Sequence, residues 1–390
     1  MKLKKWIFIL VMMSLVSAFA SEVDLSGYVR NYTGVFLQED TEFSVLQNSF
    51  DMSIGYQSNK GAFLANPYLN INKDTVSDID FRELYVDLFF NDFDVRIGKQ
   101  QVVWGKADGV FITDVVSPKN LQGFMLPDFK EIRIGVNAAK VNYYLGGSMI
   151  EVIWVPQFVS NTMPSDDSIW NTRHIDFSSS ADYLDTSLEN SEFFARYSIM
   201  TSLCDLELVG GYMWDDEPVI TGMSLGDYTF EHERLAMAGG SASSTLGDFV
   251  LRSEGAYYTG KDFVTSGNLL ESDYIHYMGG LDYSFAGYKI STQFIQKAIL
   301  NYDDSMVRDQ FSTTMTSMIT KKFLRDTLTT EFFTYVEFGD INALLRPKLT
   351  YAFDDGISLI FGANFFVGDS GTYGQFDNND MAFLQIKYNF

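Results

Sequence analysis

The chain has 390 residues, a formal net charge of -23, and 46% hydrophobic and 16% aromatic residues. So acidic a chain is unsuited to nucleic acid, whose phosphates are bound by basic surfaces, and so hydrophobic a chain is unlike an acidic disordered segment. Its single cysteine, Cys204, excludes an intramolecular disulfide. The length alone allows either several soluble domains or one large barrel.

Residues 1–20 have the pattern of a cleaved secretory signal peptide. Lysines in the first five residues make a positive start, an apolar run extends to Val16, and Ala18-Phe19-Ala20 fits a small-x-small cleavage site. The apolar run is short for a transmembrane helix. We therefore expect an exported mature chain of residues 21–390. The alternative is a retained amino-terminal anchor.

After this segment the sequence consists of stretches of about ten residues in which apolar and polar residues alternate, as in the strands of membrane barrels. We expect an all-β protein: a single transmembrane antiparallel β-barrel of about 18 strands, with 16 as the alternative. The expected strands are 23–38, 42–57, 61–72, 79–90, 93–103, 131–144, 148–157, 191–202, 205–214, 229–243, 248–260, 272–285, 288–299, 310–322, 327–337, 341–352, 357–367 and 381–390.

The connections between these strands alternate in length. The even-numbered connections are short, whereas every long connection is odd-numbered. The long connections are 104–130, 158–190, 215–228, 261–271, 300–309 and 368–380. Outer-membrane barrels have short periplasmic turns and long extracellular loops, and a soluble β-sandwich has no reason to sort its loops in this way. We therefore expect a barrel whose long loops are extracellular.

The alternation also predicts which side chains face lipid and which face the lumen. A charge on the lipid face near the midplane costs about 2–4 kcal/mol, so charged residues are assigned to the lumen. In strand 131–144 this puts Ile132, Ile134, Val136 and Ala138 on the lipid face, and Glu131, Arg133 and Asn137 inside. Arg82 breaks the alternation and is expected at the outer membrane interface.

The expected lumen charges have both signs. Basic residues would form rungs, and acidic residues would face them across the pore, which would select solutes by charge. The expected pore-lining residues are Arg96, Arg133, Arg196, Arg252, Arg346, Lys348, Glu83, Asp87 and Glu254.

The connection 104–130 is the stretch that most strongly indicates a function. It is too apolar for a loop in water, with Val110, Phe111, Ile112 and Phe124 among its residues, and glycines and prolines punctuate it with turns. We expect it to fold back into the barrel and narrow the pore. The alternative is a loop packed over the rim, or against a neighbouring protomer, for stability alone.

The run Val95–Asn120, VRIGKQQVVWGKADGVFITDVVSPKN, resembles a family of porin-like outer-membrane proteins of unknown function, similar in outline to the alginate-export porins. The matching residues are Arg96, Gly98, Gln100, Trp104, Gly105, Asp114, Pro118 and Asn120. Within the expected constriction loop these include Trp104, Gly105, Asp114, Pro118 and Asn120. An alginate-type pore implies a strongly basic lumen. This chain departs from that pattern by adding Glu83, Asp87, Glu131, Glu254 and Glu331.

The last ten residues, Met381–Phe390, alternate between an apolar set and a mostly polar set and end on an aromatic residue. This end resembles the closing strand of bacterial outer-membrane barrels, which the barrel assembly machinery recognises. We expect Phe390 on the periplasmic side.

The expected function is passive passage of small hydrophilic or amphipathic solutes through the bacterial outer membrane. One alternative is a surface structural protein or antigen whose loops bind a partner. Another is a barrel hydrolase using His174, His232 or His276, but the sequence has no nucleophile elbow and no H-x-x-x-H spacing. We expect no enzyme activity, cofactor or metal. The expected partners are outer-membrane lipid, lipopolysaccharide, the assembly machinery and the solute, with a homo-oligomer as an open alternative.

Overall fold

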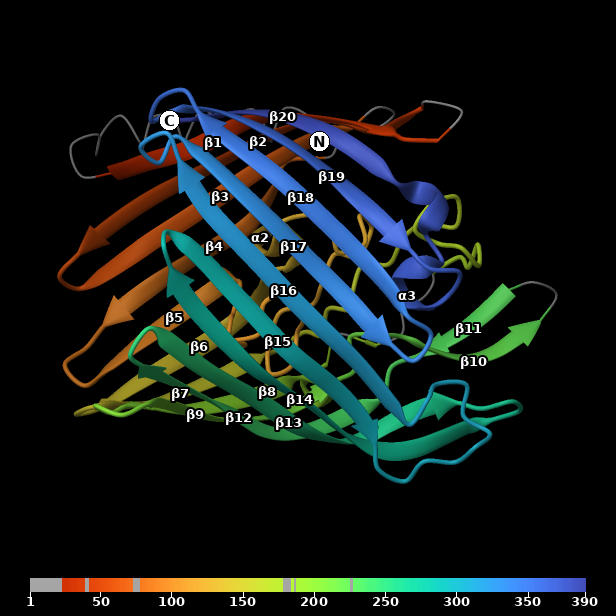
Figure 1. The fold of residues 1–390 in the computed structure, drawn as a ribbon. Helices are drawn as coiled ribbons and strands as arrows, with labels where there is room; N and C mark the ends of the chain where they lie inside the picture. Colours follow the sequence, from red (N-terminus) through yellow and green to blue (C-terminus); the bar gives the residue numbers. More distant parts are fainter. Residues whose placement is uncertain (1–22, 39–41, 73–77, 178–183, 186, 225–226) are drawn as a thin grey trace, which may run out of the picture.

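The computed structural model describes residues 23–38, 42–72, 78–177, 184–185, 187–224 and 227–390, so the expected signal peptide lies outside it. Antiparallel strands form one 18-stranded sheet (Figure 1). The sheet closes on itself because β1 (Val23–Phe36) pairs with both β2 (Phe43–Ser58) and β20 (Met381–Asn389). The prediction of an all-β barrel of about 18 strands is confirmed.

The other wall strands pair in chain order, except that β12 pairs with β9 across a separate hairpin. They are β3 (Gly61–Asn72), β4 (Asp80–Phe89), β5 (Phe93–Gln100), β6 (Val136–Leu145), β7 (Ser148–Val155), β8 (Glu192–Met200), β9 (Asp205–Trp214), β12 (Arg234–Leu246), β13 (Phe249–Val264), β14 (Leu269–Phe285), β15 (Tyr288–Ile299), β16 (Phe311–Phe323), β17 (Leu328–Phe338), β18 (Asn342–Ala352) and β19 (Ile357–Val367).

The remaining elements are short and belong to the connections. They are the hairpin β10 (Val219–Ser224) and β11 (Asp227–Glu231), the helices α2 (Phe129–Ile132) and α3 (Gly371–Gly374), and the 3-10 turns η2 (Leu188–Asn190) and η3 (Asp377–Asn379). Among the described residues, no helix has the length and apolarity needed to cross a membrane.

Two of the expected boundaries were wrong. The expected loop 261–271 is mostly strand, because β13 and β14 continue beyond their neighbours and leave only residues 265–268 as a turn. The expected strand 229–243 is two strands, of which β11 belongs to the separate hairpin and β12 to the wall.

The outer surface of the wall is apolar, as the alternation predicts. On β18 Leu349 and Tyr351 are exposed on the outer face, whereas Asn342 on the opposite face is 2% exposed. On β20 the outward residues Leu384 and Ile386 are exposed, and Met381 on the inner face is buried. A belt of this kind is suited to lipid, because a barrel in a bilayer presents apolar side chains outward.

The assignment of strand 131–144 was wrong in both its start and its facing. The strand begins at Val136, and the residues before it belong to α2 and an extended link. Val136 and Ala138 are buried on the inner face, and Asn137 is exposed on the outer one. Ile132, also expected on the lipid face, is 1% exposed. The apolar set of this strand packs inside because other apolar residues occupy the lumen beside it.

Arg82 lies inside the barrel and not at the membrane interface. The register of β3 and β4 shifts between Asn66 and Pro67, so that no residue of β3 stands opposite Arg82 in the strand pairing. Such a bulge redirects a side chain. The Nε of Arg82 donates to the Oδ2 of Asp51 at 2.7 Å, and both side chains are buried.

Leu384 tests the orientation of the wall, because its neighbour Gln385 points to the other face. We expect Leu384→Arg to destabilise the folded barrel by about 2–4 kcal/mol, the cost of a guanidinium facing hydrocarbon. Gln385→Arg is the control and should change stability far less. The measurement is urea unfolding in lipid vesicles; equal losses for the two variants would contradict an outward Leu384 and an inward Gln385.

Candidate functional site

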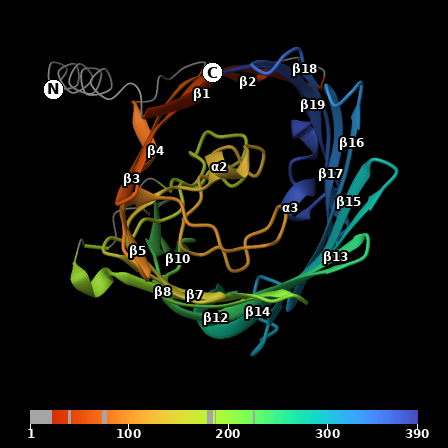
Figure 2. The ribbon, with the colours of Figure 1, turned by 90° about the vertical axis from the view of Figure 1, so that its left-hand side faces the viewer.

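Residues 101–135, which connect β5 to β6 and are called here the internal segment, leave the wall and enter the barrel. Figure 2 shows this segment, with α2, inside the ring of strands. A closed 18-stranded barrel has an interior wider than wall side chains alone fill. The internal segment is therefore the candidate determinant of what can pass.

Glu254 on β13 is the main attachment point of the first half of the segment. Its carboxylate accepts the backbone N–H groups of Lys106 at 2.6 Å, Ala107 at 3.0 Å and Thr113 at 2.7 Å. It also accepts the Thr113 hydroxyl at 2.7 Å. Glu254 is 3% exposed. These donors supply the hydrogen bonds that a buried carboxylate needs. The carboxylate in turn accepts backbone N–H groups that have no neighbouring strand to bond to.

Asp108 forms a second attachment on the same wall. Its Oδ2 accepts from Arg252 at 2.6 Å and from the Gln293 amide at 2.7 Å, while its own N–H donates to the Gln293 Oε1 at 3.0 Å. Arg252 also donates to the carbonyl of Lys106 at 2.7 Å. Arg252 and Gln293 thus fix the position of one turn of the internal segment.

Gly109, the next residue, contacts a wall strand two places further along the sheet from β15. Its φ is +85°, and a Cβ there would lie 2.5 Å from the hydroxyl of Tyr335 on β17. Only glycine combines this left-handed backbone with so close an approach. The turn at Asp108-Gly109 therefore reaches from β13 and β15 to β17.

Trp104 and Asp114 fix the start of the segment. The Trp104 indole donates to Glu151 on β7 at 2.6 Å, and its backbone N–H donates to Asp114 at 3.1 Å. Asp114 also accepts from the Nε of Arg133 at 2.8 Å. Three of the sequence-predicted residues, Trp104, Asp114 and Arg133, are therefore connected to one another.

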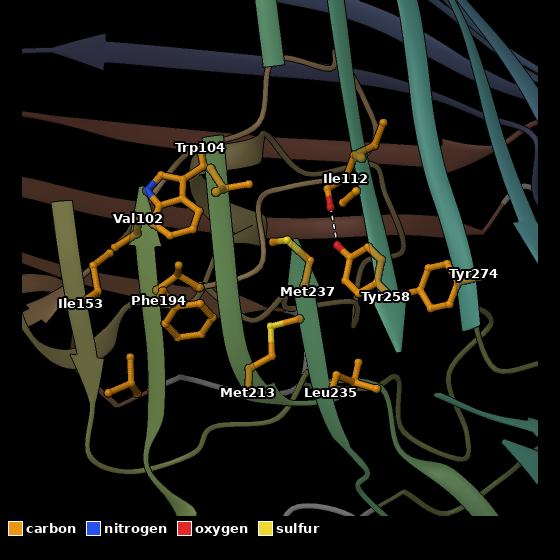
Figure 3. Packing of buried hydrophobic residues seen from close by; sticks show 14 of the residues in the cluster. Val102, Trp104, Ile112, Ile153, Phe194, Met213, Leu235, Met237, Tyr258 and Tyr274 are labelled. Carbon is orange, nitrogen blue, oxygen red and sulfur yellow. Dashed lines mark hydrogen bonds between the residues drawn. The ribbon is translucent and has the colours of Figure 1, made fainter. Parts of the chain in front are cut away.

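A hydrophobic core lies inside the barrel, between the internal segment and the inner faces of β6 to β9 and β12 to β15. Figure 3 shows Trp104 and Ile112 against Phe194 and Met237, with the hydroxyl of Tyr258 donating to the carbonyl of Ile112. The segment packs on this half of the wall through apolar side chains, as a helix packs on the sheet of a soluble protein.

The second half of the segment is attached to another part of the wall, at β18 and β19. Arg346 on β18 donates to the carbonyls of Met125 at 3.2 Å and Leu126 at 2.7 Å. Phe124 stacks on Trp170 and packs against Phe366 of β19 and against Tyr373 and Phe376 of the connection 368–380. Arg346, expected to line the pore, thus positions the segment.

Helix α2 completes the attachment on a third side. Glu131 accepts from the Tyr28 hydroxyl at 3.0 Å and forms an ion pair with Arg30 at 3.0 Å, both on β1. Lys130 lies 3.8 Å from Asp51 on β2. Among the described residues, the side chains that hold the segment therefore include members of β1, β2, β7, β13, β15 and β18.

The remaining sequence-predicted residues lie on the inner face, but the acids do not face the bases across the lumen. Arg96 and Asp87 are cross-strand neighbours joined at 2.7 Å, and Lys348 pairs with Glu331 on the adjacent strand at 2.7 Å. Arg196 reaches Glu151 at 3.3 Å. The expectation of acids facing bases across the pore was wrong, since opposite charges pair locally where burial makes an unpaired charge costly.

The last predicted residues are Glu83 on β4, whose carboxylate contacts the internal segment, and three residues of the segment itself. Glu83 accepts the N–H of Gln101 at 3.1 Å. The carbonyl of Pro118 accepts from Ile134 at 2.7 Å, and the N–H of Asn120 donates to Ile132 at 2.6 Å. Gly105 would place a Cβ 3.2 Å from Asp114.

A layer of charged loop residues lies beyond the internal segment. Lys119 of the segment lies 3.7 Å from Asp216, in the connection after β9. Burial raises the pKa of Asp216 to about 7, with Lys119 opposing that shift. Lys261 holds the pKa of the neighbouring Glu217 well below its usual range. The layer ties the internal segment to the outer connections.

Sequence reasoning missed Asp108, Gln293 and Glu151. Glu151 occupies an inward position of its strand and could have been found from the alternation. Asp108 and Gln293 are 185 residues apart in the chain, and no local pattern joins them.

Comparisons with known proteins agree with this fold. A family model described as a protein of unknown function (DUF1302) matches residues 51–276. No curated protein matches the chain. Among solved structures, Pseudomonas aeruginosa OccK8 (OprE) is similar with a TM-score of 0.60 at 11% identity, over 95% of this chain and 98% of that one.

Two further structures give the same result. Pseudomonas aeruginosa OpdL is similar with a TM-score of 0.58 at 9% identity, over 95% of this chain and 99% of that one. Pseudomonas aeruginosa OccK2 (OpdF) in complex with glucuronate has a TM-score of 0.59 at 10% identity, over 95% and 98%. Likeness at these identities shows the shared barrel fold.

Glu254→Gln should loosen the internal segment while leaving the barrel wall folded. A neutral amide cannot accept all four of the hydrogen bonds that the carboxylate receives. Charged hydrogen bonds contribute about 1.5–3 kcal/mol. We therefore expect amide hydrogen exchange in residues 106–113 to become at least about tenfold faster.

Glu331→Gln is the matched control, because Glu331 pairs with Lys348 on the neighbouring strand. Its exchange in residues 106–113 should equal that of the unmodified chain. Unchanged exchange in Glu254→Gln would show that Glu254 does not hold the segment.

Proposed function

The chain belongs to the DUF1302 family of proteins of unknown function, and we propose that it is an outer-membrane channel for passive passage of small hydrophilic or amphipathic solutes. One observation carries the proposal. A non-strand segment is fastened by inner-face side chains on several sides within a closed 18-stranded barrel. A segment held at several points of the wall is suited to narrowing an aqueous path to a defined width.

The wall supports a location in the outer membrane. Its outward residues are apolar, and Lys321, near a short turn, lies 3.7 Å from the ring centroid of Tyr288. Aromatic and basic residues of this kind gather where hydrocarbon meets head groups. The proposed partners are outer-membrane lipid, lipopolysaccharide and the barrel assembly machinery.

The internal segment is proposed to set the constriction. It is attached at Glu254, at Arg346 and at Arg30, on three different parts of the wall. A loop packed only over the rim would not need buried partners on these strands. The alternative role, stability alone, predicts that removal of the segment changes folding and leaves conduction as it was.

The solute is proposed to be small. The lumen carries paired charges of both signs, as in Arg96–Asp87 and Lys348–Glu331, which does not favour a long polyanion. The likeness in outline to alginate-export porins therefore stays a prediction, and an acidic polysaccharide is not our proposed substrate. The complex of OccK2 with glucuronate supports the idea that a barrel of this fold can admit a small carboxylate.

We propose no catalytic role for the barrel. The ring Nδ1 of His232 lies 2.6 Å from the carbonyl of Asp215, and its ring packs on Phe158. His276 lies on β14 opposite Lys297. These surroundings favour structural roles for both residues. A hydrolase would lose detergent-activated turnover in His232→Ala or His276→Ala.

Planar-bilayer recording tests the channel and its constriction. The full chain should give discrete ion-conducting steps. Replacing residues 106–126 by a short glycine linker should raise the single-channel conductance several-fold, because the segment that fills the lumen is gone.

Shortening the β10–β11 hairpin, which stands apart from the wall sheet, is the control and should leave conductance near its original value. Folded protein that carries no current would overturn the channel and favour a partner-binding surface protein. Current that is unaffected by removing 106–126 would refute the constriction.

A further inference from the structure

A cavity of about 260 Å³ lies near the end of β15, the start of β16 and the end of β17, beside the connections 300–310 and 368–380. Lys297 and Arg308 line it from β15 and the connection that follows, and Glu337 and Asp340 line it from β17 and the turn that follows. Lys297 is four residues beyond Gln293 on β15, which at the rise of a strand is about 13 Å. The cavity therefore lies on the path between the long loops and the internal segment.

Lys297 supplies a positive charge without a carboxylate within ion-pair distance among the described residues. Its Nζ lies 4.1 Å from the ring centroid of Tyr274, and its cross-strand neighbours are His276 and Ser312. An ammonium group in such a position gains from an anion that can approach it. Arg308, paired with Glu217 at 3.3 Å, lies at the exposed edge.

The other side of the cavity is acidic. Glu337 already accepts from the Asn342 amide and from the N–H of Thr372, each at 2.9 Å. Asp340 accepts from the hydroxyl of Ser370 at 3.3 Å. Asp309 adds a third carboxylate to the lining. Because three acids accompany two bases, a solute with only negative charge would meet repulsion as well as attraction.

The walls between the charged groups are apolar. Phe263 and Ile299, both buried, belong to the lining. A small site with opposite charges and apolar walls is complementary to a solute that carries both charges and an apolar body.

We propose that this cavity binds zwitterionic solutes with an apolar side chain, such as a free α-amino acid. The carboxylate is directed to Lys297 and Arg308, and the ammonium group to Asp340 and Glu337. Only the role of this binding, as a loading step before the constriction, rests on the proposed channel function. The binding itself is independent of it.

Binding can be measured with the full chain in detergent micelles by titration calorimetry. L-phenylalanine is the probe, N-acetyl-L-phenylalanine removes its positive charge, and L-phenylalanine amide removes its negative charge. We expect saturable binding of the zwitterion and affinities at least about tenfold weaker for the two analogues, since each lacks one charge-assisted contact.

Lys297→Met and Asp340→Asn should each weaken binding of L-phenylalanine at least about tenfold. Lys289→Met is the matched control, because Lys289 is on the same strand, eight positions before Lys297, near the short turn at residues 286–287. Its affinity should equal that of the unmodified chain. Heat-dependent gel mobility checks that each variant is folded.

Equal or tighter binding of N-acetyl-L-phenylalanine would overturn the proposal in favour of an anion site. Absence of saturable L-phenylalanine binding in a chain that conducts ions would overturn it while leaving the channel intact. Binding with the expected pattern in a chain that carries no current would support the cavity and refute the channel.

Discussion

The structure depends on one constraint: a chain that crosses the inside of a barrel has no neighbouring strand to satisfy its backbone. Glu254 meets this constraint by accepting three N–H groups and one hydroxyl of the internal segment. Both partners gain, because the Glu254 carboxylate is only 3% exposed and needs these donors to replace water. Arg252 and Arg346 do the converse, donating to the carbonyls of Lys106, Met125 and Leu126. Charged wall residues thereby replace strand pairing inside the barrel.

These polar attachments act together with an internal hydrophobic core. Trp104 illustrates the combination, since its ring packs edge-on against Phe194 while its indole N–H donates to Glu151. The apolar contacts exclude water from the hydrogen bonds, which strengthens each of them. Half of the barrel is consequently built like a soluble protein, with a core between sheet and loop, and the proposed passage must run beside that core.

Much of the fold could be predicted because period-two alternation is local. It predicted the strands β18 and β20 within a residue at each end, but it shows which residues share a face and not which medium that face meets. Val136 and Ala138 look lipid-facing for this reason, although they pack inside. The bulge opposite Pro67 reverses Arg82, and nothing near Arg82 in sequence signals it. Glu254 and Thr113 form a hydrogen bond although they are 141 positions apart, and no local sequence pattern predicts such a contact.

Local pairing of charges changes what the lumen can select. Arg96 and Asp87 were expected to act across the pore, yet as neighbours at 2.7 Å their fields largely cancel at a distance. Discrimination by charge then falls to places where pairing is incomplete. Lys297 is one such place, because its ammonium group lies against the aromatic ring of Tyr274. In the channel we propose, solutes are sorted first at the cavity near Lys297, by the positions of their charges, and afterwards at the internal segment, by size.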